Sequence, residues 1–148
     1  MTYIAREQSE YSGQPLELYR FSLGVKQWLY TSGDAIVTFE GDNYYPVYIK
    51  RSGFTRTSDI RKSSIEIEVS RDNDVSLLFR LGWLAGVMMV TIYRHHYEDS
   101  EFVAIWKGRV TTCKWSGSIA SLASDSVATL LKRAGLRRVY QVGCPHAL

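Results

Sequence analysis

The chain has 148 residues, of which 45% are hydrophobic and 22% charged, and its net charge is +3 at pH 7. This length fits one domain, or one domain and a fragment, and the composition excludes a disordered chain. The net charge is far below that of a dedicated nucleic-acid binder, and two cysteines are too few for a disulfide scaffold. With no signal segment at the start, we expect synthesis in a reducing cytoplasm. The longest nearly uncharged run, 81–93, is too short to span a bilayer.

Alternating apolar and polar residues predict a first β-strand at 16–23. This pattern places Tyr19 and Phe21 on one face and Leu18 and Arg20 on the other. The aromatic share of 13%, with 10 Tyr and 4 Trp, also favours strands and contact surfaces.

A short strand is predicted at 28–31, followed by a hairpin. Its arms are 35–39 and 44–49, and they flank Glu40-Gly41-Asp42-Asn43, a sequence typical of tight turns. Pro46 cannot donate a backbone hydrogen bond, so we expect the second arm to be an edge strand or to carry a bulge.

The middle of the chain predicts a loop, a strand and a helix. The Arg-rich run 50–62 is either a solvated loop or a contact for an acidic partner. Residues 63–69 alternate strictly, so one face of this strand is core and the other is wet or an interface. Asp74 is a candidate cap for a short helix at 75–81, and Gly82 is its expected C-terminal stop.

Residues 87–93 are apolar on both faces and predict a central strand. The polar run 94–101 is expected to reverse the chain, with His95 and His96 in the hairpin loop. The next strand should begin at 102 and run to 110.

Gly108 predicts a bulge or a close backbone approach in that strand. The extended pattern continues through 111–115 and resumes at 119–124, and a second short helix is expected at 127–131, ending at Gly135. The fold class is therefore mainly β, an antiparallel barrel or sandwich with two short helices. We expect residues 1–148 to form a single β-rich domain.

A hydrolase is the first enzyme class that the sequence suggests, because Cys144 and His146 lie two residues apart. Across a proline in an extended segment, their side chains are too far apart for a direct thiolate–imidazole bond. Neither a nucleophile elbow nor an orienting third residue accompanies them. A cell-wall hydrolase domain stays an alternative, and we expect no enzymatic activity.

Candidate metal ligands are scattered. Asp72-Asn73-Asp74 lacks the spacing of a calcium loop, and neighbouring His95 and His96 point to opposite sides of an extended chain. Cys113 is interpreted as a packed thiol. Cys144 is a candidate first ligand of a site whose other ligands lie beyond residue 148.

Four basic residues gather near the C-terminus: Lys132, Arg133, Arg137 and Arg138. They suit either an OB-like module that binds single-stranded nucleic acid or a cationic docking surface for a protein. Tyr44 and Tyr45 are further candidate contact residues, each also suited to a core. We select as interface candidates Arg137, Arg138, Tyr140, Trp28 and Trp83.

Three segments, 63–73, 102–110 and 136–148, together resemble the tail-tip or baseplate hub proteins of long-tailed phages and gene transfer agents. The chain is similar in role to the lambda-like tail-tip protein L. The most specific part is the ending Cys144-Pro145-His146-Ala147-Leu148. We interpret 136–148 as the start of a C-terminal cysteine-containing region that is cut off here.

The resemblance implies a structural virion protein of the tail tip, assembled in the host cytoplasm. Its implied partners are further copies in a homotrimer, the distal tail protein and the central fibre or receptor-binding protein, with no nucleic acid. Some family members hold an iron–sulfur cluster in the C-terminal region, and only Cys144 matches that pattern. The resemblance therefore implies no cofactor within residues 1–148, and a possible cluster in the complete gene product.

Overall fold

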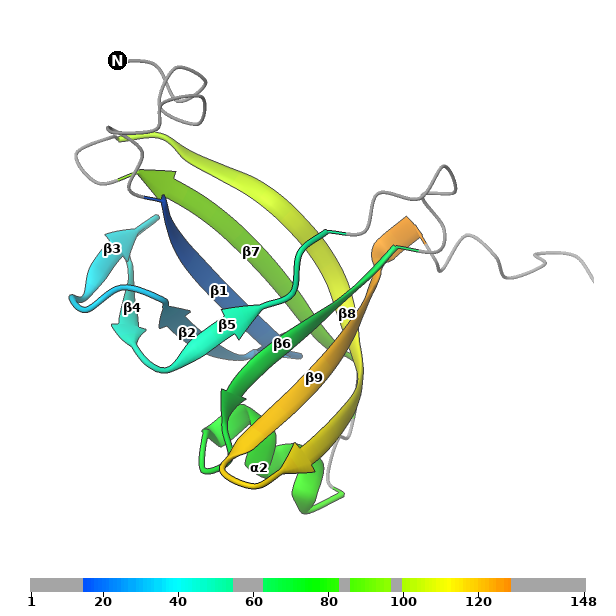
Figure 1. Cartoon of the computed structure of the whole chain (residues 1–148). Coiled ribbons are helices and arrows are strands. Elements are labelled where there is room, and N and C mark those ends of the chain that lie inside the picture. The colour runs from blue at the N-terminus through cyan, green and yellow to red at the C-terminus, as the bar shows by residue number, and fades with distance from the viewer. Residues whose placement is uncertain (1–14, 55–62, 83–85, 97–99, 129–148) are drawn as a thin grey trace, which may run out of the picture.

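The computed structural model describes residues 15–54, 63–82, 86–96 and 100–128. They form nine strands and one helix, coloured along the chain in Figure 1. The elements are β1 Pro15–Leu23, β2 Lys26–Thr31, β3 Val37–Phe39, β4 Asp42–Pro46, β5 Ile49–Arg51, β6 Ser64–Ser70, α2 Asp74–Arg80, β7 Met88–His96, β8 Phe102–Ser116 and β9 Ile119–Ser126.

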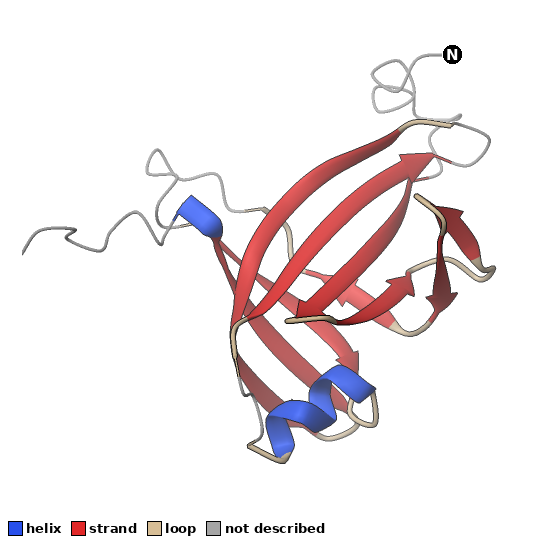
Figure 2. Ribbon diagram, turned by 180° about the vertical axis from the view of Figure 1, so that it is seen from behind, coloured by secondary structure: helices blue, strands red, loops and turns tan. Residues whose placement is uncertain are grey.

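All nine strands belong to one sheet with the order β3-β4-β2-β1-β7-β8-β9-β6-β5. Every neighbouring pair is antiparallel except β2 and β4. The sheet curls strongly but its edges do not join, so it is sandwich-like (Figure 2). The predicted mainly-β, antiparallel fold class is confirmed.

The main core lies inside the curl, where apolar residues from alternate positions meet. Tyr19 and Phe21 of β1 share one face of the strand, as the alternation of 16–23 predicts, and both are fully buried there. The same holds for β6, whose buried face carries Ile65, Ile67 and Val69. Each large side chain fully removed from water stabilises the fold by about 1.5–3 kcal/mol, so this face dominates the stability.

The helix α2 lies at one end of the curled sheet, near the ends of β6, β8 and β9 (Figures 1 and 2). Its cap is Asn73 and not the predicted Asp74, because the Asn73 side chain accepts a hydrogen bond from the Val75 N–H at 3.0 Å. Gly82 follows the helix with a φ of +66°, in agreement with the predicted stop. Val75 anchors the helix in the main core.

The second arm of the predicted hairpin divides into two strands, β4 and β5, that lie far apart in the sheet order. β4 ends at Pro46, and β5 begins at Ile49 beside β6. The expectation of an edge strand at Pro46 is wrong, because β4 lies between β3 and β2. Pro46 lies beyond Tyr44, the last residue of β4 that pairs with β3. The next backbone N–H, that of Val47, donates to the Thr31 carbonyl at 3.2 Å.

Strand β7 is longer than predicted. The expected polar loop begins too early, because β1 extends the ladder with Leu16 opposite His95 and Pro15 opposite His96. Both histidines are buried at the end of β7, so their assignment to a hairpin loop is wrong. A pairing partner far away in sequence overrides the polar composition of this run.

Gly108 lies at a close backbone approach in β8, as predicted. A Cβ atom there would lie 2.5 Å from the Asp125 carbonyl oxygen and 2.6 Å from the Ser124 hydroxyl. The register of β8 also shifts twice, once against β7 and once against β9. This glycine allows β8, the longest described strand, to bend between its two neighbours.

Several predictions fall outside the described residues. They are the loop over 55–62, most of the second helix at 127–131, and the C-terminal region 136–148.

Candidate interaction surface

The β3–β4 hairpin packs on the outer face of the sheet, opposite the main core. Its turn is Glu40-Gly41, where both residues have positive φ angles of 54° and 86°, which suits the twist of a two-residue hairpin. In the sheet order β3 and β4 follow β2, and the hairpin lies beside the start of β1 and the end of β7 (Figure 1).

An aromatic stack fixes the hairpin to this face. The Phe39 ring lies 4.2 Å from the Phe102 ring and 5.0 Å from the Tyr93 ring, measured between centroids. The His95 ring also stacks on the Phe102 ring, with centroids 4.1 Å apart and the ring planes almost parallel. Stacked aromatic pairs add about 0.5–1.5 kcal/mol each beyond their buried area, so the hairpin is held firmly.

Arg20 joins the hairpin to the centre of the sheet. Its Nε donates to the Tyr44 hydroxyl at 3.0 Å, and its Nη2 lies 3.0 Å from Glu40 and 3.4 Å from Asp42. The guanidinium also lies over the Tyr93 ring at 5.6 Å. Burial lowers the pKa of Arg20, but Tyr44 and Glu40 outweigh it and raise that pKa, so the side chain stays charged.

The opposite face of the hairpin is exposed to solvent, and it carries the hydrogen-bonded pair Thr38 and Asn43 as well as aromatic and aliphatic side chains. Tyr44 is fully buried under the hairpin, and its neighbour Tyr45 is 55% exposed. Ile36, one position before β3, is 57% exposed. Tyr48, between β4 and β5, is 56% exposed.

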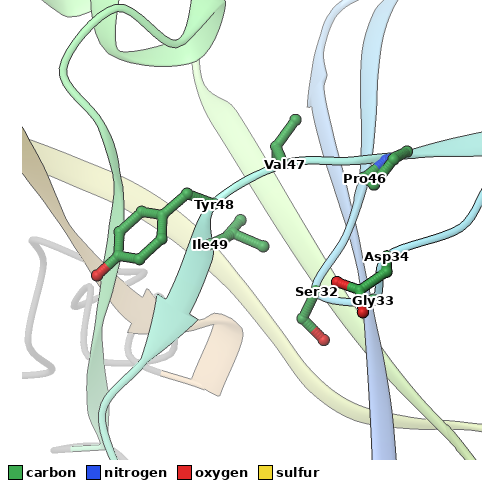
Figure 3. A pocket seen from close by; sticks show the side chains of 7 residues that line it. All are labelled: Ser32, Gly33, Asp34, Pro46, Val47, Tyr48 and Ile49. Carbon is green, nitrogen blue, oxygen red and sulfur yellow. The ribbon is translucent and has the colours of Figure 1, made fainter.

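Tyr48 is one of the residues that line a pocket of about 380 Å³. The turn after β2 forms one wall and the segment between β4 and β5 forms the other (Figure 3). The polar wall carries Asp34, and the apolar wall carries Pro46, Val47 and Ile49. We call Ile36, Tyr45, Tyr48 and this pocket the tyrosine surface.

The segment that forms the tyrosine surface contains acidic residues and no basic ones. Residues 32–49 contain three carboxylates, on Asp34, Glu40 and Asp42, and no Lys, Arg or His, although the whole chain has a net charge of +3. Asp34 and Glu40 are exposed. Tyr45 was a candidate contact residue from the sequence, whereas Ile36, Tyr48 and Asp34 were not. The absence of basic residues from 32–49 was the sequence feature that could have indicated this surface.

A buried ionic cluster closes the gap between β5 and β1, on the inner face of the sheet. Three nitrogen–oxygen contacts of 2.6 to 3.1 Å join the Arg51 guanidinium to the Glu17 carboxylate. Arg94 of β7 donates to the same carboxylate at 3.1 Å, and the Tyr19 hydroxyl donates at 2.7 Å. Through Arg51, the cluster joins β5 to β1 and β7, strands with which β5 shares no backbone ladder.

Glu17 is ionised in this cluster. Burial alone would raise the pKa of Glu17, but hydrogen bonds from Arg51 and Tyr19, the charge of Arg51 and a hydrogen bond from Arg94 lower it below the usual 4.5. Burial and the neighbouring Glu17 charge raise the pKa of Tyr19, so its hydroxyl stays protonated and donates. The result is a charged carboxylate that accepts hydrogen bonds from Arg51, Arg94 and Tyr19.

The structure describes only part of the predicted set of site residues. Trp28 lies on β2, half-buried against the main core. Cys113 is also half-buried against that core, and burial raises the pKa of its thiol to about 11, which keeps it protonated and unreactive. Outside the described residues lie Cys144, Arg137, Arg138, Tyr140 and Trp83.

The described residues offer neither a metal-binding group of side chains nor a membrane-spanning helix. Within residues 15–54, 63–82, 86–96 and 100–128, no three His, Cys, Asp or Glu side chains are grouped so as to hold a metal ion. In the same ranges, no helix has the length and apolar character needed to cross a membrane.

Comparison with known proteins shows a similarity in fold to a solved structure. No family model matches the sequence, and no curated protein matches it either. Among solved structures, the fold is similar to that of a chain in "Virion of native gene transfer agent (GTA) particle", with a TM-score of 0.73 and 14% sequence identity. The alignment covers 99% of this chain and 51% of that one. The two share a fold, and the present chain spans about half the length of its counterpart.

Proposed function

We propose that this protein is a structural, non-enzymatic component of a phage-like particle, located in the baseplate hub at the tail tip. The observation that carries the proposal is the fold shared, over 99% of the chain, with a protein of a gene transfer agent virion. The three segments that resemble tail-tip hub proteins support the same role independently of the fold. In this role, the chain connects the tail tube and the distal tail protein to the central fibre or receptor-binding protein.

The architecture suits such a connector. A sheet curled around one core, with a second aromatic layer under the β3–β4 hairpin, gives a rigid body whose exposed residues are available for contacts. The exposed tyrosines of the tyrosine surface belong to the residue class that dominates protein interfaces. We propose a homotrimer, in which identical copies form a closed ring.

The test is to locate the protein in purified particles. Gold-labelled antibodies raised against the chain should mark the end of the tail distal to the head in electron micrographs. Antibodies against the major tail-tube protein, which should mark the whole tail, are the control. Absence of the chain from particles, or label on the head or along the tube, would contradict the proposal.

The cluster implied by the family resemblance stays a separate proposal about the complete gene product. Cys144, outside the described residues, is the proposed first ligand. The complete product, purified without oxygen, should contain iron and sulfide and lose both in the Cys144→Ser variant. Cys113→Ser is the matched control and should retain them. A colourless, iron-free protein would reject the cluster and leave the structural role unaffected.

A further inference from the structure

Three exposed apolar side chains beside a pocket suit a protein contact. Ile36, Tyr45 and Tyr48 are each more than half exposed, and the pocket beside them has apolar side chains on one wall. Tyrosine and isoleucine side chains left in water offer area that binding would bury, and the two tyrosine hydroxyls can still donate hydrogen bonds at the rim.

The charge of this surface indicates which chemical groups a partner should present. Residues 32–49 have three carboxylates and no basic residue, and Arg20 from β1 pairs with two of those carboxylates. Asp34, on the pocket wall, is exposed and has no ion pair among the described residues. A partner for this surface should therefore present cations next to apolar or aromatic groups.

The same chain contains a stretch of that composition. Residues 132–140 contain four basic residues, no acidic residue, and the apolar side chains Leu136, Val139 and Tyr140. We propose that the tyrosine surface of one copy binds the basic stretch 132–140 of a second copy. This inference names the contact between copies in the proposed assembly and rests on that assembly role.

The contact joins two different parts of the chain, so it is heterologous. Each copy has one tyrosine surface and one basic stretch, and copies can therefore add head to tail until the ring closes. Such a contact gains affinity from opposite charges and loses it as salt screens them, over a Debye length of about 8 Å at physiological ionic strength.

The test uses charge reversal in the full chain, with self-association measured by analytical ultracentrifugation at low and high salt. The wild type should associate, and more weakly at high salt. Asp34→Lys and, separately, Arg137→Glu with Arg138→Glu should each weaken association by about tenfold or more. Combining all three substitutions in one chain should restore much of the loss, because the charges are complementary again.

Matched variants separate this contact from general charge effects. Asp72→Lys makes the same charge change at an exposed site next to α2 and should leave association unchanged. Tyr45→Ser should weaken association without changing its dependence on salt. Melting curves check that each variant is folded.

Two results would overturn the inference. One is a wild type that stays monomeric at low salt, and the other is an Asp34→Lys variant that behaves like Asp72→Lys. If either occurs while antibodies still mark the tail tip, only this contact is rejected. Absence of the chain from particles would reject the proposed function instead.

Discussion

The Arg51 guanidinium of β5 lies 2.6 Å from the Glu17 carboxylate of β1, although the strands β7, β8, β9 and β6 separate β5 from β1 in the sheet. This ion pair brings the far edge of the curled sheet back to its centre. The two side chains are only 10% and 15% exposed, so water screens the contact weakly. In a closed barrel, backbone hydrogen bonds join the first and last strands. Here the side-chain cluster joins the edge strand β5 to β1.

Removal of Arg51 should weaken the whole fold. In Arg51→Met, Glu17 keeps Arg94 and Tyr19 but loses its closest cation while still mostly buried. We expect the free energy of unfolding to fall by about 2–3 kcal/mol, below the loss for a fully buried pair because some solvent reaches this one. Urea unfolding followed by tryptophan fluorescence measures it. Lys50→Met, at an exposed site on the same strand, should change the free energy far less. Equal effects would show that the ion pair is dispensable.

The same cluster predicts an acid-sensitive contribution to stability. The pKa of Glu17 is lower in the folded protein than its usual 4.5, so its contribution is fully present above that value and is lost as the pH falls through the folded-state pKa. Wild type should therefore exceed Glu17→Gln in unfolding free energy at neutral pH, and the difference should shrink below ~pH 4.5. Urea unfolding between neutral and acidic pH measures this difference. Glu101→Gln, at an exposed site, should follow the wild-type profile, and a constant Glu17→Gln difference at all pH values would disprove the assignment.

Local sequence patterns predicted the features of the fold that depend on a few adjacent residues. The alternation around Tyr19 and along Ser64–Ser70 separated the two faces of each strand correctly, because side chains along a strand have a period of two. The alternation did not tell which of the two faces is buried. A turn after Phe39 was also predicted, as the four residues 40–43, whereas in the structure the turn is the two residues Glu40-Gly41. These features depend on a few adjacent residues.

Features that depend on distant partners were not predictable. Glu17 and Arg51 lie 34 residues apart, and no pattern in either segment indicates the pair. His95 looked like a loop residue until β1 supplied its ladder and Phe102 its stacking partner. The tyrosine surface was missed for a related reason, since exposure of Tyr45 and burial of Tyr44 follow from which face of the hairpin meets the sheet.

Gly108 should tolerate no side chain. In Gly108→Ala, the new Cβ would lie 2.5 Å from the Asp125 carbonyl oxygen and 2.6 Å from Trp106 Nε1, and the backbone oxygen cannot move without disturbing β9. We expect a loss of about 1–3 kcal/mol in unfolding free energy, the usual cost of overpacking. Thermal and urea unfolding measure it. Gly53→Ala is the matched control, because nothing lies within 4 Å of its added Cβ, and it should be neutral or slightly stabilising.

Phe39 should hold the β3–β4 hairpin locally, with little effect on the main core. Phe39→Ala removes the ring contacts with Phe102 and Tyr93, so the hairpin should open more often while β6 and β9 keep their ladder. Amide hydrogen exchange, read by mass spectrometry, should rise at least about tenfold in peptides covering 37–46 and stay unchanged in peptides covering 64–70. Ile36→Ala, on the exposed face of the same hairpin, is the control and should leave both rates unchanged. Faster exchange across all strands would mean that the hairpin and the core unfold together and that the aromatic stack belongs to one cooperative unit.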